Sequence, residues 1–182
     1  MQDNLKMSKK LRDVVMSTQQ VLCTGNPEKN TIASGIKEIW PNTTFIYKSS
    51  GYDLYHMPST TKEKLVTNIK KHNIIVNASY VGYNVQLNFL NFVANELKYG
   101  HVFNIGSTHE YDNLGNEEYK ESKLNLRNRS LEINNYRLNT THLMLGSIDL
   151  ITPLKIAKMI KWITEQDVKF PILCIDQEKK SW

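Results

Sequence analysis

The sequence predicts one α/β domain with a Rossmann-like, doubly wound and mostly parallel sheet. Short apolar runs alternate with segments of helical period along almost the whole chain. At least one of these runs is apolar without alternation, which is typical of strands covered by helices on both faces. Most of the runs end in turns that contain glycine, serine or threonine. We expect residues 19–182 to form this domain and residues 1–18 to be a polar or amphipathic lead-in.

Six segments have the composition of β-strands. The first runs directly into Thr24-Gly25, the second is β-branched and aromatic, and the third is continuously apolar. The fourth ends in Gly106-Ser107, and the fifth is broken at Gly146. The six are expected over residues 20–23, 43–47, 73–76, 101–105, 138–145 and 171–175.

Five segments between these strands have helical period or helix-boundary residues. Pro41 stops the first, a serine or threonine caps the second, and Gly100 closes the third. The fourth begins near Tyr119, and Pro153 lies in the first turn of the fifth. The helices are expected over residues 36–40, 60–71, 85–99, from 119 onward and over 152–166.

The composition is that of an ordinary globular protein with a modest basic excess. The chain has 182 residues, of which 40% are hydrophobic and 23% charged, and a net charge of +5 at pH 7. That length suffices for one sizeable core. The charge could favour a phosphorylated cofactor or nucleic acid. Because the basic residues are scattered and no recognition motif accompanies them, nucleic acid ranks last among the expected partners.

Membrane and metal-binding classes find no support in the sequence. The first ten residues contain no apolar core of signal-peptide length, and no later run is long enough to span a bilayer. The five histidines show no metal-ligand spacing. We therefore expect a cytoplasmic protein with no metal site and no membrane partner.

Two glycines could serve a phosphate-binding turn after the first strand. An apolar strand that runs into Thr24-Gly25 is how a dinucleotide-binding unit begins. The next glycine is Gly35, followed by Ile36. We expect these four residues to contact the cofactor, and a plain surface loop with two turn glycines is the alternative.

Lys48-Ser49-Ser50 follows the second strand, where a dinucleotide-binding fold meets the adenosine ribose. Sites that prefer NAD place a carboxylate here to accept from the 2′-hydroxyl. A cation and two hydroxyls suit a 2′-phosphate, so NADP(H) is predicted over NAD(H). A lysine that merely solvates the strand end is the alternative.

Tyr119 and Lys123 lie one turn apart on the same face if their segment forms a helix. An ammonium held beside a phenol favours the phenolate, so we expect the pKa of Tyr119 to be lowered. Ser107 ends the preceding strand, twelve residues earlier. A solvated helix start is the alternative, because both residue types are common on exposed helices.

The ordered set of these segments resembles the short-chain dehydrogenase/reductase family from roughly Val21 to Ile175. The helix that begins after Asn84 resembles the family's helix with the catalytic asparagine, and Ser107 stands where the family has its catalytic serine. The other matching pieces, in the order of the family, are Thr24-Gly25, Asn77-Ala78-Ser79, Tyr119-x-x-x-Lys123 and Leu145-Gly146-Ser147-Ile148.

The resemblance implies a role for each matching residue. Tyr119 is implied to exchange a proton with the substrate oxygen while hydride moves to or from the nicotinamide. Lys123 is implied to lower the pKa of Tyr119 and to hold the nicotinamide ribose. Ser107 would donate a hydrogen bond to the substrate oxygen, and Asn84 would anchor a proton-relay water. The implied cofactor contacts include Asp53 with the adenine, the backbone of Ile148 with the carboxamide, and Asn77-Ala78.

We therefore expect an NAD(P)-dependent oxidoreductase that acts on a small carbonyl or alcohol. The resemblance also implies a homodimer or homotetramer, because family members pair the helices after Ser79 and after Tyr119. These helices carry apolar residues beyond one core-facing stripe, namely Phe89, Phe92, Leu124 and Leu126. The alternatives are a monomer, and a catalytically inactive nucleotide-binding or scaffold protein that kept the fold.

Overall fold

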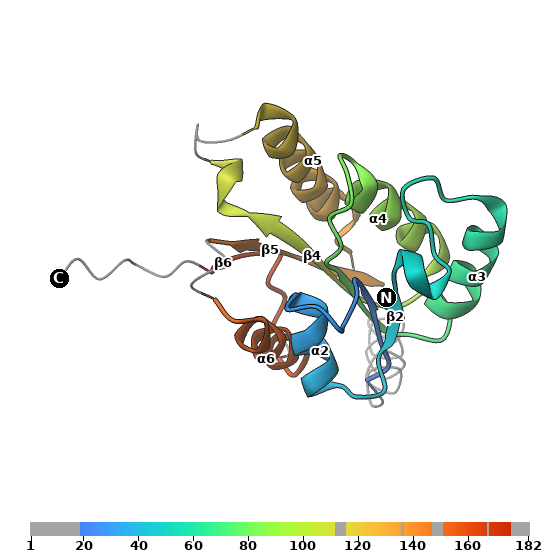
Figure 1. The fold of residues 1–182 in the computed structure, drawn as a ribbon. Coiled ribbons are helices and arrows are strands. Elements are labelled where there is room, and N and C mark those ends of the chain that lie inside the picture. The colour runs from blue at the N-terminus through green and yellow to red at the C-terminus, as the bar shows by residue number, and fades with distance from the viewer. Residues whose placement is uncertain (1–18, 112–115, 136, 147–150, 167, 176–182) are drawn as a thin grey trace, which may run out of the picture.

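Six parallel strands form one sheet in the order β2-β1-β3-β4-β5-β6 (Figure 1). The computed structural model describes residues 19–111, 116–135, 137–146, 151–166 and 168–175, so the expected lead-in lies outside the described residues. The chain runs from β1 outward to β2 and then crosses back past β1 to β3, which makes the ends of β1 and β3 a topological switch point. The strands are β1 Val21–Thr24, β2 Thr44–Ile46, β3 Ile74–Asn77, β4 Gly100–Ser107, β5 Leu138–Leu145 and β6 Ile172–Ile175.

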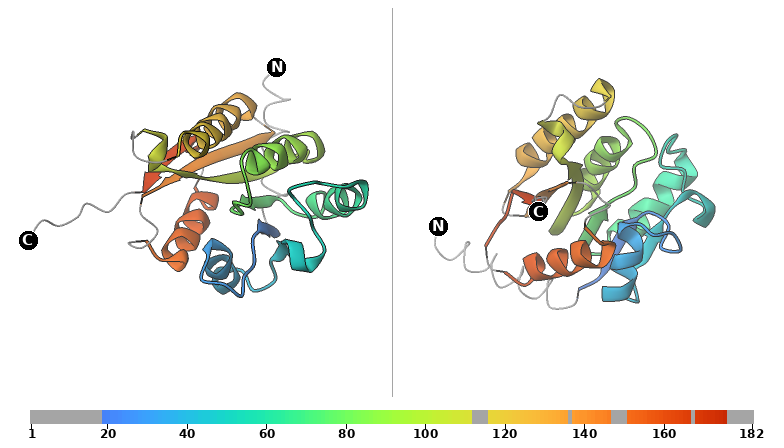
Figure 2. Two further views of the ribbon diagram at one scale, coloured as in Figure 1. Left: turned by 45° about the horizontal axis from the view of Figure 1, so that its top comes forward. Right: turned by 60° about the vertical axis from the view of Figure 1, so that its left-hand side comes forward.

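Helices cover both faces of the sheet, as expected for a doubly wound fold (Figure 2). α2 and α6 lie side by side on one face, and α3, α4 and α5 lie on the other. The helices are α2 Ile32–Ile39, α3 Ser59–Ile69, α4 Val85–Glu96, α5 Glu117–Ile133 and α6 Pro153–Thr164. Two short 3₁₀ helices, η1 Lys48–Ser50 and η2 Thr108–Glu110, follow β2 and β4. In the described part of the chain, no helix is long and apolar enough to cross a membrane.

The sheet separates the core into two halves, one on each of its faces. Val21 and Cys23 face α2 and α6, whereas Leu22 between them faces α3, α4 and α5. β3 alternates in the same way, with Ile75 on the second face. Because both faces are buried, these strands need no polar face, and this explains the apolar run of β3 in the sequence.

The structure differs from the sequence-based expectation most at the start of α2 and at the boundary between α4 and β4. α2 begins at Ile32, four positions earlier than expected, with Thr31 extended at the N-cap. Gly35 therefore lies inside the helix and not in the preceding loop, contrary to the prediction. β4 extends over eight residues, all buried, and so includes Gly100, which we expected to close the preceding helix.

Gly35 serves the packing of α2 against α6. A Cβ at this position would overlap the backbone carbonyl of Pro153 at the start of α6. The glycine thus allows the two helices to approach closely, which is its structural role in place of the expected phosphate contact.

Candidate active site

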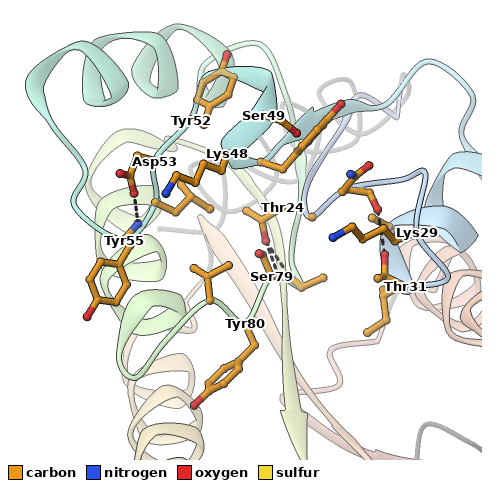
Figure 3. A pocket seen from close by; sticks show the side chains of 18 of the residues that line it. Thr24, Lys29, Thr31, Lys48, Ser49, Tyr52, Asp53, Tyr55, Ser79 and Tyr80 are labelled. Atoms are coloured by element: carbon orange, nitrogen blue, oxygen red, sulfur yellow. Dashed lines mark hydrogen bonds between the residues drawn. The ribbon is translucent and has the colours of Figure 1, made fainter.

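A cavity of about 770 Å³ opens at the carboxyl ends of β1, β2 and β3 (Figure 3). This is the switch point of the sheet, where doubly wound folds bind ligands. Its wall includes six of the predicted cofactor-binding residues, namely Thr24, Gly25, Lys48, Ser49, Asp53 and Ala78. Gly35, Ile36 and Asn77 do not line it, and Ile148 lies outside the described residues.

Thr24 joins the ends of β1 and β3 at the floor of the cavity. Its buried Oγ1 accepts hydrogen bonds from the backbone N–H groups of Ala78 and Ser79, both at 2.9 Å. One hydroxyl thus holds the two strand ends between which the switch point lies.

Gly25 makes the turn from β1 toward α2. Its φ of +127° falls in the region that favours glycine, and a Cβ there would lie 3.2 Å from the Cβ of Ala33. The close approach brings the first turn of α2 to the cavity, which Ile32 and Ala33 line. Helix N-termini present N–H groups and a positive dipole end to bound anions.

Two lysines line the cavity from different sides (Figure 3). Lys48 and Ser49 come from η1, and Lys29 comes from the loop before α2 (Figure 3). Among the described residues, neither ammonium forms an ion pair with a carboxylate. A negatively charged group bound in the cavity would therefore meet a lysine on either side (Figure 3).

Asp53 lines the cavity but directs its carboxylate into its own turn. Oδ1 accepts from the backbone N–H groups of Tyr55 and His56 at 3.0 and 3.1 Å. Oδ2 lies 2.8 Å from His56 Nδ1, and the hydrogen bond with this side chain lowers the pKa of Asp53. The expected contact with an adenine would have to use the remaining acceptor capacity of these oxygens.

Ser107 and Tyr119 meet beside the cavity. Ser107 is the buried last residue of β4, and its side chain hydrogen-bonds to the phenol of Tyr119 in the first turn of α5. Asn116 caps this helix by accepting from the N–H groups of Glu118 and Tyr119. Tyr80, which lines the cavity, has its ring centre 5.1 Å from that of Tyr119 and so connects the pair with the cavity.

Lys123 points its ammonium toward the sheet. Nζ donates to Gln86 Oε1 at 2.5 Å and to the carbonyl of Ile105 at 2.9 Å. It lies 5.4 Å from the ring centre of Tyr119 and 5.1 Å from that of Tyr80. The side chain is only 3% exposed, and this burial lowers the pKa of Lys123 to about 8.

The expected lowering of the Tyr119 pKa by Lys123 is wrong for this structure. Desolvation of the half-buried phenol raises the pKa of Tyr119 above its ordinary value, against the hydrogen bond from Ser107, which lowers it. The charge of Glu110 raises it as well. The physical reason is that the ammonium is engaged by Gln86 and Ile105 and does not contact the phenolic oxygen.

Asn84 and Asn77 support the site from α4 and β3. Asn84 is the N-cap of α4, with a φ of 61°, and its backbone N–H donates to Ser122 Oγ at 3.2 Å. Asn77 is buried and donates from Nδ2 to the Gln86 carbonyl and to Asn104 Oδ1. In this structure Asn77 therefore holds α4 against the sheet.

Sequence reasoning missed Gln86, which contacts Lys123 directly. It is 4% exposed and also donates to the carbonyls of Asn77 and Ile105. The signal was present, because Gln86 lies on the buried stripe of α4 with Phe89, Leu90 and Val93. A polar residue on an apolar stripe requires a buried polar partner. Other missed residues that line the cavity are Lys29, Tyr47, Tyr52, Tyr55, His56 and Tyr80.

A doubly wound parallel sheet with a cavity at its switch point defines a dinucleotide-binding type of fold. Neither a family model nor a curated protein matches the sequence. The structure, however, is similar to serine dehydrogenase from Escherichia coli, with a TM-score of 0.72 and 16% identity, covering 90% of this chain and 100% of that chain.

Two further similar structures were solved with a nicotinamide cofactor. One is 3-alpha-hydroxysteroid dehydrogenase from Pseudomonas sp. B-0831 with NADH, at a TM-score of 0.63 and 13% identity, covering 87% of this chain and 95% of that chain. The other is an oxidoreductase of the short-chain dehydrogenase/reductase family from Brucella ovis with a partially ordered NAD. Its TM-score is 0.61 and its identity 14%, and the match covers 87% of this chain and 100% of that chain. The chain therefore has the fold of the short-chain dehydrogenases/reductases, which confirms the expected resemblance at the level of structure.

Proposed function

We propose that the chain is an NAD(P)-dependent oxidoreductase that transfers hydride between a nicotinamide cofactor and a small carbonyl or alcohol. The observation that carries the proposal is the hydrogen-bonded pair of Ser107 and Tyr119 beside Lys123. This pair adjoins a cavity at the switch point of a fold shared with dehydrogenases that were solved with NADH and NAD.

The cavity offers matching chemistry for a phosphorylated dinucleotide. The pyrophosphate would lie at Thr24, Gly25 and the first turn of α2. The adenosine end would lie at Lys48, Ser49 and Asp53. The ammonium of Lys48, which forms no ion pair among the described residues, favours NADP(H) over NAD(H). Ala78 lines the cavity at the β3 end, and by the family resemblance the backbone of Ile148 would meet the carboxamide.

The nicotinamide would supply or accept the hydride, and the chain's own residues would handle the proton. Tyr119 Oη exchanges a proton with the substrate oxygen, and Ser107 Oγ donates a hydrogen bond to that oxygen as charge develops on it. Lys123 has three donors, of which two are used by Gln86 and Ile105. The third would hold the nicotinamide ribose, and Asn84 would anchor a proton-relay water.

A homodimer or homotetramer formed through α4 and α5 belongs to the same proposal, as does a cytoplasmic location. Phe89 and Leu126 do not support the assembly, because both are buried in this chain's own core. Phe92 and Leu124 are half-buried, and Leu131 on α5 is 41% exposed. These three side chains are the apolar surface that such an interface would use, and light scattering of the purified chain tests it.

Fluorescence titration with NADPH and NADH tests the cofactor proposal. We expect both cofactors to bind, NADPH more tightly than NADH. If neither binds at millimolar concentration, the cofactor proposal is wrong and a catalytically inactive scaffold explains the fold better. A panel of small aldehydes and ketones then tests turnover. Tyr119→Phe should abolish turnover and leave cofactor binding nearly intact, whereas Tyr99→Phe, an exposed tyrosine that does not line the cavity, should change neither.

A further inference from the structure

Glu110 is a buried carboxylate directly behind the Ser107–Tyr119 pair. It is the last residue of η2 and is 4% exposed. Its Oε1 accepts from the backbone N–H of Ser107 at 3.1 Å, and Ser107 Oγ accepts from the N–H of His109 at 3.2 Å. The two residues thus close a capping box, and the orientation of Ser107 depends on Glu110.

The space around this carboxylate is formed by β4, β5 and α5. His142 Nε2 lies 2.7 Å from Glu110 Oε1, and because a carboxylate only accepts, the imidazole donates. Arg127 Nη1 lies 3.6 Å from Glu110 Oε2. Gly106 makes room for the contact, since a Cβ there would overlap His142 Nε2.

Stability alone does not account for Glu110. Among the described residues, Glu110 Oε2, Arg127 Nη1 and His142 Nδ1 are buried without a hydrogen-bond partner. A buried ion pair with incomplete hydrogen bonding is often less stable than well-packed apolar side chains of the same volume. A charge retained in this setting beside a reaction site points to an electrostatic role.

The carboxylate acts on both ionisable groups of the proposed proton-transfer pair. After desolvation, the charge of Glu110 contributes to the raised pKa of Tyr119. It also opposes the burial that lowers the pKa of Lys123. The other titratable or charged groups that contact it are His142 from β5 and Arg127 from α5, and His109 from η2 lies beside the ring of Tyr119.

We propose that Glu110 is a positioning residue of this site, which fixes the backbone of Ser107 and holds a negative charge behind the phenol of Tyr119. The inference rests on the proposed oxidoreductase function. When a carbonyl is reduced, Tyr119 donates its proton to the carbonyl oxygen while hydride from the reduced nicotinamide reaches the carbonyl carbon, so the carbonyl becomes an alcohol and the cofactor is oxidised. The negative charge of Glu110 opposes ionisation of the phenol and so keeps this proton on Tyr119 until it is transferred.

Glu110→Gln in the full chain tests the role of the charge, because the amide keeps the acceptor for Ser107 and His142. A pH titration followed by NMR of ¹³C-labelled tyrosine, with Tyr119 assigned through Tyr119→Phe, should show a lower Tyr119 midpoint than in the native chain. An unchanged midpoint in the folded variant overturns the proposal. Glu117→Gln, which removes an exposed carboxylate from the first turn of the same helix, should leave the midpoint in place.

Glu110→Asp separates charge from position, because it keeps the carboxylate but withdraws it by one methylene. We expect the Tyr119 midpoint to stay near that of the native chain and the amide exchange of Ser107 to become about tenfold faster, since its acceptor is lost. If Glu110→Gln does not fold, Glu110→Asp tests the proposal alone. An amide exchange rate of Ser107 equal to that of the native chain would then overturn the positioning role. Cofactor titration of the same samples tests the proposed function separately. If no cofactor binds but the Tyr119 midpoint shifts in Glu110→Gln, only the proposed oxidoreductase function is contradicted.

Discussion

Lys123 Nζ lies 2.5 Å from Gln86 Oε1, and this contact determines where the ammonium points. The amide of Gln86 is held in turn by its donation to the carbonyls of Asn77 and Ile105. The lysine is therefore fixed between α4 and β4, and its burial is compensated by neutral acceptors. Neutral acceptors stabilise an ammonium less than a carboxylate does, which agrees with its lowered pKa.

Replacing Gln86 by glutamate should raise the pKa of Lys123. A carboxylate at hydrogen-bond distance favours the charged ammonium, so we expect an upward shift of at least about one unit from about 8. NMR titration of ¹⁵N-labelled lysine measures it. Asn88→Asp adds a carboxylate to an exposed position of the same helix and should leave the Lys123 titration unchanged. An equal shift in both variants would contradict the direct contact.

The stability of the chain should rise with pH between about 8 and about 9. From about 8 to about 10.5 the unfolded chain binds a proton at Lys123 that the folded chain does not, so this group alone raises the free energy of unfolding by on the order of 3 kcal/mol. Above about 9 the buried thiol of Cys23 acts in the opposite direction, because burial raises its pKa and the unfolded chain loses this proton first. The raised pKa of Tyr119 opposes the rise as well from about 10.

Urea unfolding at several pH values measures this slope. Lys123→Met should remove most of it, because the variant has no ammonium to desolvate. Lys62→Met, at an exposed position of α3, is the matched control and should keep the slope. A slope that persists in Lys123→Met would assign it to another group.

The fold could be predicted from the sequence because the composition of the strands and the residues at their ends are both recognisable. β3 is apolar up to Asn77 at its end, and β5 carries two β-branched threonines and an apolar end before Gly146. Burial of both sheet faces favours such runs. The start of α2 could not be predicted, because Thr31 caps it without a side-chain hydrogen bond and Gly35 lowers the helix propensity. The reason for Gly35 is the approach of Pro153, a contact between residues far apart in the sequence.

The candidate site was predictable only where strand ends and one-turn spacing bring residues together. These rules indicated Thr24, Lys48, Ser107 and Tyr119. They could not show the direction of a side chain, so the Lys123 ammonium was expected at Tyr119 and lies at Gln86. A role for Glu110 was not predicted for the same reason, because its burial depends on the space that Gly106 leaves beside His142.

Thr24→Val should destabilise the fold by about 1 to 3 kcal/mol, because it leaves two partly buried backbone N–H groups without their acceptor. Valine matches threonine in shape, so the loss reports the hydroxyl and not a cavity. Thermal unfolding measures it, and Thr24→Ser, which keeps the hydroxyl, should lose clearly less. Equal losses in the two variants would mean that packing of the methyl group dominates.

Lys48→Glu should distinguish the two cofactors. Reversing this charge places a carboxylate where we propose a 2′-phosphate, so the affinity for NADPH should fall about tenfold or more. The affinity for NADH should change little, since a carboxylate can accept from the 2′-hydroxyl. Fluorescence titrations of both cofactors measure this, with Lys62→Glu as a control that makes the same charge change on α3, away from the cavity. Equal losses for NADPH and NADH would place the 2′-phosphate elsewhere.

Gly35→Ala should separate α2 from α6 and so test whether helix packing supports the cavity. The added methyl group would overlap the Pro153 carbonyl, which is backbone and cannot rotate away. Overpacking of this kind costs typically about 1 to 3 kcal/mol, more than the gain in helix propensity from alanine. Because the first turn of α2 lines the cavity, the displacement should also weaken NADPH binding several-fold. Lys37→Ala, at an exposed position of the same helix, loses only a surface ion pair and should change both quantities little. Weakened binding with unchanged stability would show that Gly35 meets the cofactor, as the sequence alone led us to expect.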